Sequence, residues 1–123
     1  MKIINKMLKI CFTVLFLASI PVFAENKTPD KSSSNQEASA YYEKGKKLYD
    51  EKNFKEAFPL LLKAAEMGHS DAQMHVGKMY YNGWGVGHSH EKGKEWHQKA
   101  AKQGNKESIQ KLYNMEHHTG SAH

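Results

Sequence analysis

The chain has one cysteine and no arginine among its 123 residues. The cysteine, Cys11, lies near the start, so the rest of the chain has no disulfide and must rely on apolar burial for stability. All 18 basic residues are lysine, whereas arginine better suits bidentate contacts to phosphates and bases. Three lysines and no acidic residue lie before residue 25, so the remainder carries a formal charge of only +2. These features argue against nucleic acid as a partner.

The first 24 residues have the composition of an export signal. Three lysines precede an uncharged apolar run over residues 10–23, and Val22 and Ala24 place small residues before a cleavage point. The run is shorter than the roughly 20 residues that a membrane-spanning helix requires. We therefore expect cleavage after Ala24, a mature protein without a stable membrane anchor, and a periplasmic or secreted location.

Two short segments lack the apolar residues that folding needs. Residues 25–36 contain no aromatic or branched apolar side chain and are rich in serine, asparagine and lysine, which predicts a flexible leader. Residues 118–123 are predicted to be a flexible tail. The folded part is expected over residues 37–117.

Within that span the sequence repeats itself. The spacing of Ala40, Gly45 and Tyr49 recurs 32 residues later at Ala72, Gly77 and Tyr81. Residues 63–68 recur 36 residues later as residues 99–104, so the second unit has gained four residues, which fall in the glycine-rich stretch 82–87. Such a period is typical of stacked-repeat proteins. We predict units over about 38–69 and 70–105 and a capping helix over about 106–117.

Each unit has the apolar spacing of two helices. Ala40, Gly45 and Leu48 are expected to face the second helix of their pair, and Trp96 to pack in the core of the next unit. Asn53 is expected to cap a helix in which Pro59 causes a kink or a late start but not a break, and the glycines at 68 and 104 are expected to end helices.

Residues 72–104 carry a more specific pattern. Its small, aromatic and glycine positions are Ala72, Gly77, Tyr80, Tyr81, Gly83, Gly85, Trp96, Ala100 and Gly104. This pattern resembles the Sel1-like repeat, a longer relative of the tetratricopeptide repeat, and residues 40–68 look like a plain tetratricopeptide unit. The resemblance implies an all-α, short right-handed α/α solenoid that acts as an adaptor or scaffold, with no catalytic residues and no cofactor. His97 stands where the family usually has tyrosine.

By the same resemblance, the first helix of each pair lines a concave groove. The groove residues are expected to be Tyr42, Lys46, Tyr49, Met74, Lys78, Tyr81 and Asn82, and the third helix would continue the row with Gln110, Asn114 and His117. A stripe of tyrosines and lysines without an acidic residue suits a peptide or protein partner that carries carboxylates. The alternative is that these lysines only keep the helix soluble. Trp84 is a further candidate contact, and the protein is expected to be a monomer.

The histidines offer an alternative function, a metal-binding or metal-buffering protein. The candidate ligands are His88, His90, His97, His117 and His118. No acidic or thiol residue stands at a defined spacing to them, so we interpret them as loop and surface residues and expect no metal site.

The export signal makes a direct prediction. The intact mass of the protein recovered from cells should correspond to a chain that begins at Glu25. Recovery of a membrane-bound form that retains Met1 would contradict it.

Overall fold

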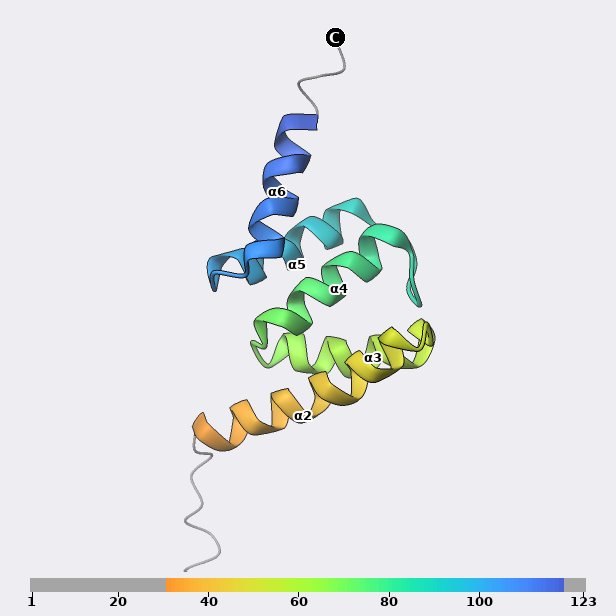
Figure 1. Cartoon of the computed structure of the whole chain (residues 1–123), viewed down its shortest axis with the longest axis vertical. Coiled ribbons are helices and arrows are strands. Elements are labelled where there is room, and N and C mark those ends of the chain that lie inside the picture. The colour runs from red at the N-terminus through yellow and green to blue at the C-terminus, as the bar shows by residue number, and fades with distance from the viewer. Residues whose placement is uncertain (1–30, 119–123) are drawn as a thin grey trace, which may run out of the picture. The chain divides into compact units, whose positions relative to one another are not determined.

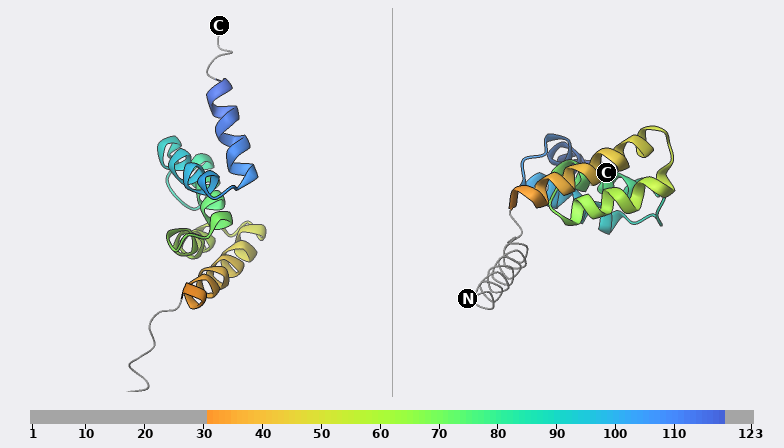
Figure 2. Two further views of the ribbon diagram at one scale, coloured as in Figure 1. Left: turned by 90° about the vertical axis from the view of Figure 1, so that its left-hand side faces the viewer. Right: turned by 90° about the horizontal axis from the view of Figure 1, so that it is seen from below.

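The computed structural model describes residues 31–118, and they form an all-α stack. Its helices are, in chain order, α2 (Lys31–Asp50), α3 (Phe54–Glu66), α4 (Ser70–Asn82), α5 (His90–Lys102) and α6 (Lys106–His118). Each helix packs against the next, so the pairs α2/α3 and α4/α5 are followed by the single helix α6 (Figures 1 and 2). The predicted solenoid of two helix pairs and a capping helix is confirmed. The predicted signal peptide, cleavage site and tail after residue 118 lie outside the described residues.

Within residues 31–118, none of the helices combines the length and the hydropathy that crossing a bilayer requires.

Helix α2 begins earlier than the sequence indicated. The prediction of a flexible leader does not hold for residues 31–36, which form the first turns of this helix. The Ser34 hydroxyl donates to the Lys31 carbonyl and the Ser39 hydroxyl to the Asn35 carbonyl, at 3.0 and 2.9 Å. These serine hydroxyls form hydrogen bonds within their own helix and need no buried partner. The extra turns therefore leave no pattern of apolar residues in the sequence.

The buried face of α2 also differs from the predicted one. Ala40 is exposed, while Ala38, Tyr42 and Gly45 are buried. Gly45 lies directly against α3, where a Cβ atom on it would come within 2.8 Å of the Leu61 Cγ atom. The helices of the first pair therefore meet at a glycine, as predicted, but Tyr42 is in the core and Ala40, expected there, is exposed.

Helix α3 tolerates its proline. Pro59 is exposed and lies inside a helix that runs unbroken from Phe54 to Glu66. The carbonyl that loses its helical partner belongs to Lys55, an exposed residue, so water can bond to it. Asn53 occupies the N-cap position as predicted, but its side chain makes no capping hydrogen bond.

The second pair repeats the close approach of the first. A Cβ atom on Gly77 of α4 would lie 2.9 Å from His97 Cδ2 and 3.1 Å from the Gly93 carbonyl oxygen of α5. The apolar core runs through both pairs and includes Ala57, Leu61, Ala64, Val76 and Met79. Trp96 is partly buried against this core, which confirms its predicted packing role.

The two turns that end α3 and α5 are linked by side chains. Gly68 and Gly104 both adopt positive φ, 94° and 86°, as predicted for residues that end helices. The Gln103 amide donates to the Gly68 carbonyl at 3.0 Å, and the Asn105 amide donates to Asp71 Oδ1 at 2.9 Å. Asn105 also accepts from the Ser108 backbone N–H, so it caps α6 while tying it to the start of α4.

The Gly77 contact generates a test of the helix pairing. Gly77→Val should lower stability by roughly 1 to 3 kcal/mol or more, because a branched side chain would overlap His97 and the α5 backbone. Thermal unfolding followed by circular dichroism should show a lower midpoint. Gly87→Val is the matched control, since no atom lies within 4 Å of a Cβ atom at Gly87 and its midpoint should change little. Equal midpoints for the two variants would contradict the packing described here.

Candidate functional site

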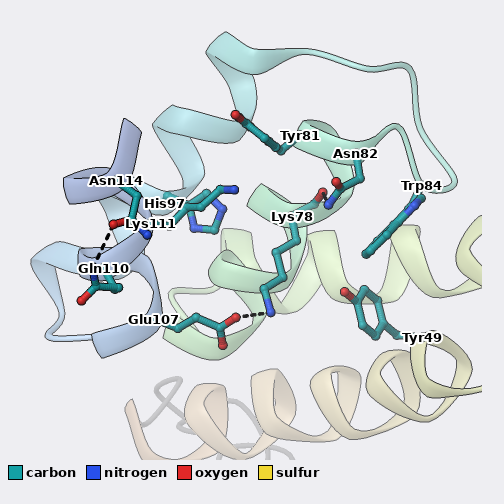
Figure 3. A pocket seen from close by; sticks show the side chains of 10 residues that line it. All are labelled: Tyr49, Lys78, Tyr81, Asn82, Trp84, His97, Glu107, Gln110, Lys111 and Asn114. Atoms are coloured by element: carbon teal, nitrogen blue, oxygen red, sulfur yellow. Dashed lines mark hydrogen bonds and ion pairs between the residues drawn. The ribbon is translucent and has the colours of Figure 1, made fainter. Parts of the chain in front are cut away.

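A cavity of about 330 Å³ lies among helices α2, α4, α5 and α6 and the loop after α4 (Figure 3). We call it the first cavity, and its walls are Tyr49, Lys78, Tyr81, Asn82, Trp84, His97, Glu107, Gln110, Lys111 and Asn114. The set combines aromatic rings, amides and charged groups from four helices and the loop that follows α4.

The first cavity gathers much of the predicted groove. The groove residues that it contains are Tyr49, Lys78, Tyr81 and Asn82. The predicted loop contact Trp84 and two residues of the predicted α6 row, Gln110 and Asn114, also line it. His117 does not line the first cavity, and its Nδ1 atom lies 2.9 Å from the Tyr113 carbonyl oxygen. That these residues bind a partner stays a prediction.

Tyr42 and Met74 belong to the core and not to the groove. They are only 9% and 7% exposed. The Tyr42 ring stacks on His69 at 4.3 Å and meets His75 edge-on at 5.6 Å. Burial, with smaller contributions from Asp71 and other carboxylates, raises the pKa of Tyr42 to about 12. The side chain is therefore a neutral packing element with little surface for a partner.

Lys46 lies outside the first cavity. Its Nζ atom is 2.7 Å from the Asp50 Oδ2 atom, one turn further along α2. This hydrogen bond raises the pKa of Lys46 and lowers that of Asp50. The predicted pairing of Lys46 with Lys78 in one groove is therefore replaced by a local ion pair on exposed helix surface.

Lys78 has an acidic partner that the sequence argument missed. Glu107 of α6 forms an ion pair with it across the first cavity (Figure 3). The expectation of a groove without an acidic residue is therefore wrong. Glu107 stands three residues before Gln110, so it continues the predicted α6 row by one helical turn towards the start of the helix, and this spacing was a signal that could have found it.

Two aromatic rings, Tyr49 and Trp84, form one side of the first cavity, and Phe54 packs against both of them from outside its lining. Trp84 stacks on Phe54 with ring centroids 4.9 Å apart, and Tyr49 meets both rings edge-on at 6.1 and 5.2 Å. The loop can approach this closely because Gly85 has no side chain, and a Cβ atom there would lie 2.3 Å from the Phe54 carbonyl oxygen. Trp84 remains 37% exposed, so part of its ring surface is free for contact.

The opposite side of the first cavity carries a lysine that sequence reasoning also missed. Lys111 of α6 places its Nζ atom 4.1 Å from the centre of the Tyr81 ring, a cation–π distance. Lys111 lies one helical turn after Glu107, again on the α6 face that the predicted row follows.

His97 is buried in the wall of the first cavity, contrary to its interpretation as a loop or surface residue. Its Nδ1 atom is 3.1 Å from the Ser108 hydroxyl oxygen, and its buried Nε2 atom has no hydrogen-bond partner among the described residues. Burial, with a smaller contribution from Lys111, lowers the pKa of His97 to about 4. The ring is therefore neutral near pH 7.

The other candidate metal ligands do not form a site. His88 and His90 lie with ring centroids 4.7 Å apart in the loop before α5 and at its start. Within residues 31–118, no three histidine, cysteine, aspartate or glutamate side chains come together as a metal-binding group. The arrangement gives no support to the metal-binding alternative.

Comparison with protein families assigns both helix pairs to the same repeat family. The model of the Sel1 repeat matches residues 35–69 and 70–105, which correspond to α2/α3 and α4/α5. Comparison with curated proteins and with solved structures finds no match.

Burial of His97 predicts a dependence of stability on pH. The unfolded chain binds a proton to this ring near its ordinary pKa of 6.5, whereas the folded chain does so only near 4. Stability should therefore be greatest above about pH 6.5 and fall towards pH 4, by at most about 1.4 kcal/mol per pH unit for this group. His75, whose pKa burial also lowers, adds to the same trend.

Urea unfolding of the chain and two variants at about pH 7 and about pH 5 measures this dependence. The loss of stability on acidification should be smaller in His97→Gln than in the unsubstituted chain. It should be unchanged in His88→Gln, whose side chain is exposed. An equal loss in both variants would contradict a buried, neutral His97.

Proposed function

Because the chain belongs to the Sel1 repeat family, we propose that it is an exported adaptor that binds an extended segment of a partner protein in the first cavity. Sel1 repeats generally mediate protein–protein interactions, and the family is a non-enzymatic repeat scaffold. The observation that carries the proposal is the lining of the first cavity, which combines a partly exposed aromatic face with amide and ammonium groups.

The aromatic side gives the ligand contact area. Trp84 and Tyr49 are held rigidly by Phe54, so little side-chain freedom is lost when a ligand covers them. Rigid aromatic side chains of this kind dominate many protein interfaces. We therefore assign an apolar side chain of the ligand to this face.

The amides of the first cavity suit a peptide backbone. Asn82 donates through Nδ2 to the Lys78 carbonyl at 2.9 Å, which leaves its side-chain oxygen available to accept from a ligand N–H. Gln110 donates to the Asn114 side-chain oxygen at 3.0 Å, which leaves the Asn114 NH₂ group to donate to a ligand carbonyl. One wall thus offers an acceptor and the other a donor, the pair of groups that an extended backbone needs.

The charge of the first cavity favours a ligand carboxylate, and the residue proposed to bind it is Lys111. Lys78 is already paired with Glu107, whereas Lys111 faces a neutral ring. The three charges sum to one positive charge, enough to favour a single ligand carboxylate. We therefore propose that the ligand carboxylate binds at Lys111, and not at the stripe with Lys46 and Lys78 that the sequence predicted.

The remaining parts of the proposal rest on the sequence and the family. The apolar run before Ala24 supports a periplasmic or secreted protein without a stable membrane anchor. We propose that it acts as a monomer, without catalytic residues or a cofactor, and without nucleic acid as a partner.

Selection of peptides from a displayed random library tests the proposal. Enriched peptides should contain an acidic residue and an apolar residue, and Trp84→Ala should weaken their binding at least about tenfold, since this ring supplies the exposed contact surface. Isothermal titration calorimetry measures the affinity, and circular dichroism confirms that the variant is folded.

Tyr113→Ala is the matched control. Tyr113 is 55% exposed on α6 and does not line the first cavity, so its loss should leave peptide affinity unchanged. Selected peptides that bind the Trp84 variant normally but lose affinity for the Tyr113 variant would place the binding surface on the outer face of α6 and contradict the proposal.

A further inference from the structure

A second cavity of about 470 Å³ lies beside the first, between α5 and α6. The two helices diverge from the turn that joins them (Figure 1), and residues of both line the cavity. His90 and Lys94, one turn apart on α5, form one wall. Lys111, Asn114, Met115 and His118, which follow helical spacing along one face of α6, form the other.

The lining of the second cavity is basic. None of the described residues that line it is acidic. The two ion pairs of residues 31–118 lie elsewhere, Lys46 with Asp50 and Lys78 with Glu107, so neither Lys94 nor Lys111 is neutralised by a salt bridge there. The two ammonium groups therefore give this cavity a higher positive charge than the first, and His90 adds an imidazole that can donate an N–H.

The two cavities share part of their lining. Tyr81, Lys111 and Asn114 line both of them. Tyr81 stands at the junction, with the Lys111 ammonium group 4.1 Å from its ring centre and the His90 ring at 4.3 Å. A ligand that occupies the first cavity can therefore extend past this tyrosine into the second without leaving the protein surface.

We propose that the second cavity binds consecutive acidic side chains of the same peptide segment that occupies the first cavity. The proposal rests on the proposed function and adds a property of the partner, an acidic run next to the residue held by Trp84. Carboxylates are favoured over a phosphoryl group by the residues present. Arginine, which binds phosphate in a bidentate manner, is absent from the chain, and the two ammonium groups stand on separate helices.

Fluorescence anisotropy with a labelled hexaglutamate peptide tests this inference on the full chain at low ionic strength. Hexaglutamine, of the same length and without charge, should bind much more weakly. Lys94→Glu should weaken hexaglutamate binding at least about tenfold, because it replaces attraction with repulsion in a cavity that has no acidic residue. Lys106→Glu is the matched control with the same change in net charge at the start of α6, outside both cavities, and should weaken binding far less.

The outcomes separate this inference from the proposed function. Equal loss of hexaglutamate affinity in the Lys94 and Lys106 variants would overturn the inference. It would also be overturned if a hexaphosphoserine peptide bound more tightly than hexaglutamate and Lys94→Glu left the affinity for that peptide unchanged. If Lys94→Glu leaves hexaglutamate binding unchanged while Trp84→Ala still weakens binding of the selected peptides, the proposed role of the second cavity is rejected and that of the first stands. If hexaglutamate depends on Lys94 but Trp84→Ala has no effect on selected peptides, the acidic site stands and the proposed role of the first cavity fails.

Discussion

The close approach of the two helices within each pair is the constraint on which the whole stack depends. Gly45 meets Leu61 in the first pair, and Gly77 meets Gly93 and His97 in the second. In both pairs a glycine lets one helix lie directly on a side chain or backbone of the other, where even a methyl group would need a shift of neighbouring atoms. Since the chain beyond Cys11 has no cysteine, these contacts and the small apolar core stabilise the fold without a disulfide.

The four extra residues of the second repeat link the repeats and shape the first cavity at the same time. They form a loop in which Gly85 lies against the backbone of Phe54, at the start of the second helix of the first repeat. That contact lays Trp84 on the Phe54 ring and next to Tyr49. One packing interaction therefore joins the two pairs and presents the aromatic face proposed to hold a ligand.

Helix α6 gives the stack its charged surface. It brings Glu107 to Lys78 and Lys111 to Tyr81, and without it neither cavity would have its second wall. Its position is held by the links from Gln103 and Asn105 to the turn and helix start of the preceding repeat. A capping helix here does more than cover the end of the core, because it contributes the polar half of the proposed binding surface.

The sequence by itself determined the pairing of the helices and the glycines at which α3 and α5 end, although not the start of α2. Helical spacing, small residues at the contacts and glycines after helices are local properties, so Gly45, Gly77, Gly68 and Gly104 all had the roles predicted for them. Only the tertiary structure decided which face of each helix is buried and which charges meet. At about 100° per residue, Ala40 lies about 140° around the helix from Gly45, so it is exposed, whereas Ala38 and Tyr42 share the buried face of Gly45. Lys78 met Glu107, and His97 lost access to water, because the stacking of α4, α5 and α6 places side chains from separate helices together.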